Sequence, residues 1–97
     1  MTDNITLIEC PRDAMQGWGR FIPTPEKADY LNTLLRVGFD VLDFGSFVSP
    51  KAIPQMADTK DVIPKLDMSG SHTRLLAIIA NLRGAQDAVQ YDEIYYL

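Results

Sequence analysis

"RLLAIIA", residues 74–80, has apolar residues on both alternating faces of an extended chain. A strand that is apolar on both faces is typical of a parallel sheet with helices on each side. A second β-rich run, "FDVLDF", covers residues 39–44, and a third covers 5–10 and ends at Pro11. With "DEIYYL" at 92–97, the sequence predicts four strands.

Helices are predicted between these strands. Thr24 suits an N-cap, and leucines at helical spacing follow it, which predicts a helix over 25–37. Asp58 can cap a short helix through 60–63, and Asn81 can cap the last helix. The apolar side predicted for that last helix consists of Leu82, Ala85, Ala88 and Val89.

The order βαβαβαβ predicts an α/β fold with parallel strands, because such alternation requires right-handed crossover connections. A closed eightfold barrel takes about 250 residues, and four strands within 97 residues come close to half of it. We therefore expect the amino-terminal half of a (β/α)8 TIM barrel, with residues 1–97 forming a single partial domain. The last strand has no helix after it, which would leave a sheet edge and a face open.

Composition excludes several classes of partner. The formal net charge is -4 and the nine basic residues are scattered, which argues against binding to nucleic acid. The longest apolar run, 75–80, is far shorter than the roughly 20 residues that a membrane helix needs, so we expect no membrane span. Cys10 is the single cysteine and no secretory leader is recognisable, so a cytoplasmic protein is the expectation.

Polar residues gather where the predicted strands end. In parallel α/β folds the ligand site lies at the carboxyl ends of the strands. The polar residues at or just after these ends are Arg12, Asp13, Gln16, Asp43, Ser46 and Asn81. Arg12 and Asp13 suit either a structural ion pair or a catalytic role, and the residues alone favour neither. Asp43 favours function, because a carboxylate inside a doubly covered strand needs a cationic partner.

Three motifs carry a resemblance to a known family. "ECPRDAMQ" (9–16), "SFVSPKAIPQMAD" (46–58) and "NLRG" (81–84) resemble the amino-terminal half of hydroxymethylglutaryl-CoA lyase, a member of the metal-dependent lyase and synthase TIM-barrel superfamily. The Arg-Asp pair alone is shared with isopropylmalate synthases and related barrels, whereas the loop over 46–56 is specific. The likeness extends over residues 5–97.

The resemblance implies cleavage of 3-hydroxy-3-methylglutaryl-CoA to acetyl-CoA and acetoacetate with a divalent metal, Mg²⁺ or Mn²⁺. It implies that Arg12 contacts the acyl substrate and that Asp13 is a metal ligand. We assign Arg12 and Asp43 as catalytic, and Arg12, Gln16 and Ser46 as substrate-binding. The expected partner is an acyl-CoA, and we expect a homo-oligomer, a dimer.

The chain departs from the family pattern in several places. Asp43 stands where relatives carry glutamate, and Cys10 stands where they carry glycine. The family's two metal-binding histidines, its asparagine ligand and its catalytic cysteine have no counterparts, and His72 suits a solvated surface position. This chain alone is therefore expected to be inactive. Two alternatives stay open: a non-catalytic half-barrel binding or assembly module, and a related metal-dependent Claisen-type synthase.

Overall fold

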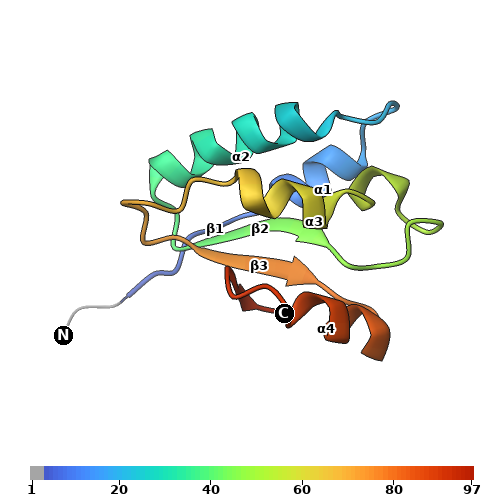
Figure 1. Cartoon of the computed structure of the whole chain (residues 1–97). Coiled ribbons are helices and arrows are strands. Elements are labelled where there is room, and N and C mark those ends of the chain that lie inside the picture. The colour runs from blue at the N-terminus through green and yellow to red at the C-terminus, as the bar shows by residue number, and fades with distance from the viewer. Residues whose placement is uncertain (1–3) are drawn as a thin grey trace.

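A four-stranded parallel sheet forms the centre of the protein, as the computed structural model of residues 4–97 shows (Figure 1). Its strands are β1 Ile8–Glu9, β2 Val41–Ser46, β3 Arg74–Ile78 and β4 Ile94–Tyr96. They lie in the order β1-β2-β3-β4, and each neighbouring pair is parallel. Parallel neighbours need a crossover connection between them, so the predicted alternation of strands and helices is confirmed.

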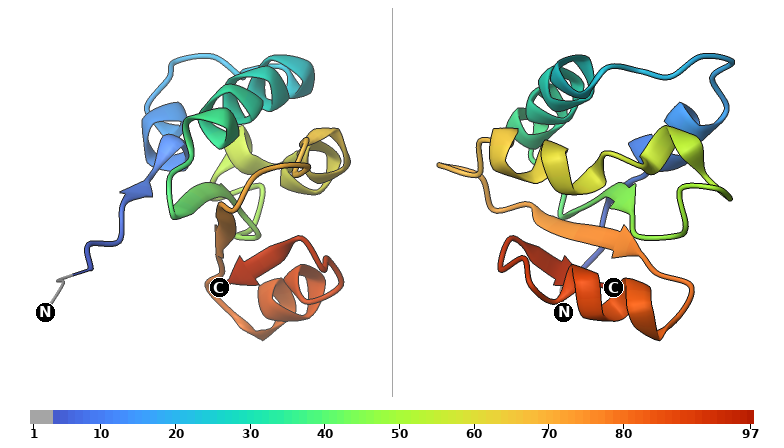
Figure 2. Two further views of the ribbon diagram at one scale, coloured as in Figure 1. Left: turned by 90° about the vertical axis from the view of Figure 1, so that its left-hand side faces the viewer. Right: turned by 45° about the vertical axis from the view of Figure 1, so that its right-hand side comes forward.

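The helices lie on the connections between the strands. They are α1 Pro11–Gln16, α2 Thr24–Val37, η1 Pro54–Met56, α3 Thr59–Val62, η2 Ile63–Lys65 and α4 Leu82–Ala88. Figure 1 shows α2 and α3 above the strands and α4 below them, and the two views of Figure 2 agree. Within residues 4–97, no helix is long and apolar enough to cross a membrane.

The hydrophobic core lies between the sheet and the helices α2 and α3. Leu42 on β2 and Leu75 on β3 are fully buried, and Leu31 and Leu35 on α2 pack into the same cluster. Burying a leucine side chain contributes about 1.5–3 kcal/mol. The leucines one helical turn apart on α2 thus fix that helix on the sheet, as their spacing predicts.

The first strand is much shorter than predicted. Residues 5–10 were expected to form a buried strand, but β1 is limited to two residues, and Ile5, Leu7 and Ile8 are exposed. The reason is that β1 pairs with β2 on one side only, within the part of the chain that the structure describes. Figure 2 shows the chain before β1 extending away from the sheet.

Helix α1 is absent from the sequence prediction. Pro11 was interpreted as a strand end, but it also occupies the first turn of a six-residue helix. Proline is well tolerated there, because the first N–H groups of a helix have no partner within the helix and the ring presets the backbone angle. Strand β1 ends at Glu9 and α1 begins at Pro11, with Cys10 between them as the N-cap, so Arg12 and Asp13 stand on a helix.

The other boundaries differ from the prediction by a few residues. Helix α2 begins at Thr24, and its N-cap is Pro23 instead of the predicted Thr24. The Thr24 hydroxyl donates to Asp58 and does not cap the helix. Strand β2 runs over Val41–Ser46, two residues later than predicted, and β3 ends at Ile78.

The face of α4 is the larger error in the prediction. Leu82 and Val89 are exposed, and Gly84 and Ala88 are buried. A Cβ atom on Gly84 would lie 2.8 Å from the carbonyl oxygen of Phe47, so the glycine allows α4 to pack closely against the chain after β2. The small side of α4 therefore faces the protein. The prediction that Asn81 caps this helix is confirmed, since its side chain accepts a hydrogen bond from the Gly84 N–H.

Candidate functional site

A forked ion pair joins helix α1 to strand β2. Arg12, in the first turn of α1, donates from Nε to Oδ1 of Asp43 at 2.8 Å and from Nη2 to Oδ2 at 3.0 Å. The two side chains are 17% and 9% exposed. Two parallel charge-assisted bonds fix both the position and the plane of the guanidinium. The predicted need of Asp43 for a cationic partner is met by Arg12.

Two more side chains complete this group, which we call the arginine cluster: Cys10, Arg12, Gln16 and Asp43. Gln16 stands one turn after Arg12 on α1, and its Oε1 accepts from Arg12 Nη1 at 2.7 Å. The Cys10 thiol, at the N-cap of α1, donates to Asp43 Oδ2 at 3.1 Å. Arg12 Nη2 also lies 3.6 Å from the Cys10 sulfur. Three of the predicted site residues, Arg12, Gln16 and Asp43, are thus in contact.

The arginine is held in its charged form. Its hydrogen bonds to Asp43 raise the pKa of Arg12 above its ordinary value and outweigh the opposing effect of burial. A guanidinium has five N–H donors, and four of those of Arg12 bond Asp43, Gln16 and Cys10. Within residues 4–97, one N–H on Nη1 is therefore left to meet a ligand.

Cys10 should be an unreactive thiol. Burial raises the pKa of Cys10 above its ordinary value of 9.0, and the hydrogen bond to Asp43 adds to this shift. We expect iodoacetamide at pH 8.5 to alkylate Cys10 more slowly in the folded chain than in the chain unfolded by urea, because less thiolate is present. Equal alkylation rates in the folded and the unfolded chain would contradict the assignment of Cys10 as an unreactive thiol.

The free energy of unfolding should also fall as the pH rises past 9, because the unfolded chain then releases the Cys10 proton first.

Asp13 is the predicted metal ligand, and it lies beside the arginine cluster on α1. Its side chain is exposed. A carboxylate offers the hard oxygen that Mg²⁺ and Mn²⁺ prefer, so its chemistry suits the predicted role. In residues 4–97, no three His, Cys, Asp or Glu side chains gather closely enough to hold a metal ion. The metal role of Asp13 stays a prediction.

Ser46 lies outside the arginine cluster. It is buried at the end of β2, where its Oγ accepts from the Val48 N–H at 3.1 Å. With Asn81, from the end of β3, it lines a hollow of about 590 Å³. The polar residues at the strand ends thus form two neighbouring groups, one around Arg12 and one around Ser46.

A buried polar network supports the same region, and the sequence did not predict it. Lys27, only 2% exposed, lies on α2 and bonds Asp58 Oδ1 at 2.5 Å and the carbonyl of Gln55. Gln55 in turn accepts from the Ile22 N–H and donates to the Arg20 carbonyl, each at 2.8 Å. The network ties the chain between α1 and α2 to η1 and α3. Lys27 stands four residues before the buried Leu31, and this spacing is the signal that could have placed it inside.

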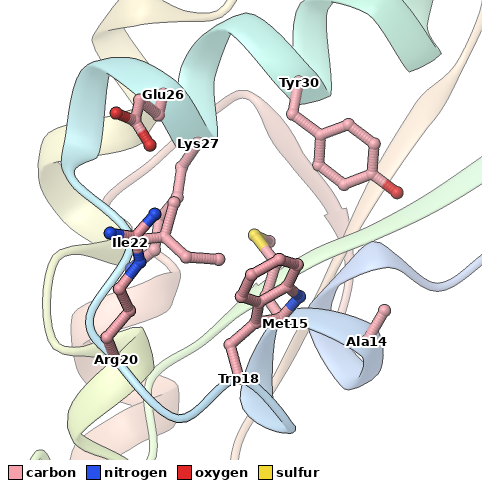
Figure 3. Close-up of a pocket in the computed structure, with 8 residues that line it drawn as sticks. All are labelled: Ala14, Met15, Trp18, Arg20, Ile22, Glu26, Lys27 and Tyr30. Atoms are coloured by element: carbon pink, nitrogen blue, oxygen red, sulfur yellow. The ribbon is translucent and has the colours of Figure 1, made fainter.

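A second hollow, of about 370 Å³, lies between α1 and α2 (Figure 3). Met15 and Ile22 form part of its wall, and in the view of Figure 3 the Trp18 ring overlaps Met15 while Tyr30 lies above them on α2. Trp18 is 61% exposed. None of the arginine cluster lines this hollow, and Trp18 contributes to it from the connection between α1 and α2.

Comparison with known proteins gives one consistent result. No family model matches the chain. Among curated proteins, the mitochondrial hydroxymethylglutaryl-CoA lyase of Arabidopsis thaliana is 40% identical over 87 residues, and the lyase YngG of Bacillus subtilis is 35% identical over 87 residues. The chain is similar to the hydroxymethylglutaryl-CoA lyases. The resemblance predicted from the sequence is confirmed.

Solved structures of hydroxymethylglutaryl-CoA lyases support this relationship. The Acinetobacter baumannii lyase, in complex with coenzyme A and 3-methylmalate, superimposes with a TM-score of 0.83 at 36% identity. The match covers 93% of this chain and 30% of that one. The lyase of Pseudomonas aeruginosa gives a TM-score of 0.81 at 32% identity. The four-stranded sheet thus corresponds to the amino-terminal part of the lyase barrel, as predicted.

The match is partial in length. The chain spans 18% of the Arabidopsis protein and 29% of the Bacillus protein. Both hydroxymethylglutaryl-CoA lyases are therefore several times longer than the part compared.

Proposed function

We propose that this chain contributes the arginine cluster to an active site that cleaves 3-hydroxy-3-methylglutaryl-CoA to acetyl-CoA and acetoacetate. The observation that carries the proposal is the forked pair of Arg12 and Asp43, which holds a guanidinium with one free N–H on the helix directly after β1. The relatives of the chain are named for this activity. On this proposal, residues 1–97 are a single partial domain that contributes part of the site.

Cleavage of the carbon-carbon bond is helped by a cation close to the thioester carbonyl oxygen. Breaking the bond between carbons 2 and 3 of the acyl group moves its electron pair toward the thioester carbonyl, so negative charge develops on that oxygen. A fixed guanidinium stabilises such charge at little cost of reorganisation. Arg12 supplies it, and Gln16 and Asp43 keep it in place. On this proposal Asp43 would accept the proton that the substrate hydroxyl releases, and the enolate would take up a proton at carbon 2 to give acetyl-CoA.

A divalent metal fits beside this group. Asp13 would provide one carboxylate ligand, with Mg²⁺ or Mn²⁺ as the preferred ion. When bound, such an ion would polarise substrate oxygens and lower the barrier to cleavage. Residues 4–97 hold no group of three such side chains, so on this proposal the other ligands would come from elsewhere.

The remaining assignments follow from the same proposal. The substrate is an acyl-CoA, and Ser46 would contact it from the hollow beside Asn81. One related structure contains coenzyme A. A cytoplasmic location and a homodimer stay predictions, and the relatives include proteins named as cytoplasmic and as mitochondrial.

A chimeric enzyme tests the proposal. Residues 5–97 would replace the matching segment of the Bacillus subtilis lyase, and acetoacetate formation would be measured with and without Mg²⁺ or Mn²⁺. We expect metal-dependent turnover from the chimera. A folded chimera without turnover, beside an active parent enzyme, would reject the lyase assignment and favour the non-catalytic module.

The metal role has its own test in this chimera. Asp13→Asn should lower turnover at least about 100-fold and raise the metal concentration needed for half-maximal rate, because the amide is a neutral and weaker ligand. Asp29→Asn, on the exposed side of α2, is the matched control and should leave both values unchanged. Normal metal dependence in Asp13→Asn would remove Asp13 from the metal site.

A further inference from the structure

The end of β2 is irregular where it carries two predicted site residues. Asp43 pairs with Leu76 and Gly45 pairs with Ala77, so Phe44 is an additional residue in β2 between two consecutive partners on β3. Such a bulge bends the strand and changes the direction of the side chains around it, and bulges are common beside active sites. Asp43 comes directly before the bulge, and Ser46 follows shortly after it.

Thr59 packs against this bulge from the first turn of α3. It is 4% exposed, and its Oγ1 accepts from the Ser46 N–H at 3.1 Å and donates to the Met56 carbonyl at 2.9 Å. Its methyl group fills the space beside Gly45, where an added Cβ atom would lie 2.6 Å from Thr59 Cγ2 and 2.9 Å from Oγ1. The threonine therefore contacts the strand through both branches of its side chain.

We propose that Thr59 is a positioning residue that fixes the bulged end of β2 and thereby the places of Asp43 and Ser46. What those two residues do there rests on the proposed function, but the placement itself does not. The hydroxyl holds the backbone of Ser46, and the methyl holds Gly45 at van der Waals distance. A shift of this end of β2 would move Asp43 relative to Arg12 and Cys10, which bond it from α1 and its N-cap.

The Cys10 thiol can report a shift of Asp43. Cys10 is the single cysteine, and its thiol bonds Asp43 and not Thr59. Its rate of modification by a disulfide reagent, at one fixed pH and below the unfolding transition, therefore reports on the placement of Asp43. Hydrogen exchange of the Ser46 amide reports directly on the bond to Thr59.

The test compares three variants of the 97-residue chain. Thr59→Val keeps the shape and loses the hydroxyl, and Thr59→Ser keeps the hydroxyl and loses the methyl. Val62→Ala, also on α3 and buried, controls for general destabilisation. We expect Thr59→Val to speed exchange of the Ser46 amide and modification of Cys10 about fivefold, as the loss of one hydrogen bond implies. Thr59→Ser should restore most of the exchange protection.

The outcomes separate the proposal from a purely structural role. If Thr59→Val alters Cys10 no more than Val62→Ala does at matched stability, Thr59 is a packing residue and the proposal is overturned. If Thr59→Val and Thr59→Ser expose the Ser46 amide equally, the hydroxyl does not hold the strand, which also overturns it. Neither measurement uses a substrate, so failure of the lyase assignment would leave both results unaffected.

Discussion

Replacing Lys27 by methionine should lower the free energy of unfolding by about 3–5 kcal/mol, because it leaves Asp58 buried without its cation. Asp58 is 8% exposed, and its two oxygens bond Lys27 and Thr24. For a chain of 97 residues, whose total stability is roughly 5–15 kcal/mol, this loss is a large fraction. Urea unfolding followed by circular dichroism measures it.

Two further variants make this result specific. Lys60→Met removes an exposed lysine of α3 and should change stability by less than about 0.5 kcal/mol. The double variant Lys27→Met, Asp58→Leu removes both buried charges and should recover most of the loss, since apolar pairs often replace buried ion pairs at little cost. A Lys27→Met chain as stable as the parent would show that the pair is not buried in solution.

Arg12→Gln should have the largest effect on turnover. In the chimera with the Bacillus subtilis lyase, removing this guanidinium should lower the rate of acetoacetate formation about 100-fold to 1,000-fold, because the developing charge loses its fixed donor. The same change leaves the Asp43 carboxylate, 9% exposed, without a cation and should cost about 3 kcal/mol of stability.

The control for this prediction is Arg36→Gln in the last turn of α2, where the arginine is exposed. It should retain parental turnover and stability. Measuring both variants well below their unfolding transitions separates loss of catalysis from loss of fold. Near-normal turnover in a folded Arg12→Gln chimera would reject the catalytic role of Arg12.

The fold could be predicted from the sequence where the hydrophobic pattern agrees with the residues that mark the ends of helices and strands. "RLLAIIA" is apolar on both faces, and the structure makes it the inner strand β3. Asn81 is followed by a helix that it caps. These signals are local, since each lies within a few residues of the element it predicts.

Other features depend on contacts that the sequence does not display. Proline can mark either the end of a strand or the start of a helix, and at Pro11 the sequence alone does not show that a helix, α1, begins there. Leu82 and Val89 suit a buried face by hydrophobicity, yet the close approach of α4 at Gly84 turns them outward. Tertiary packing therefore determines which face of α4 is buried, and this face differs from the one that the apolar pattern predicts.

In the candidate site, too, some contacts could be predicted from the sequence and others could not. The positions of Arg12 and Asp43 at neighbouring strand ends suggested that they meet, and they do. The third bond to Asp43, from Cys10, was missed because a cysteine at a strand end suits simple burial equally well. Lys27 and Thr59 were missed because their partners lie 31 and 13 residues away along the chain.

The most direct test of the central claim is a crystal structure of the chimera with a non-cleavable analogue of 3-hydroxy-3-methylglutaryl-CoA. We expect a hydrogen bond between the acyl group of the analogue and Nη1 of Arg12, with the fork to Asp43 retained. An ordered acyl group bound away from Arg12, or an Arg12 that has left Asp43 and contacts no ligand, would contradict the account.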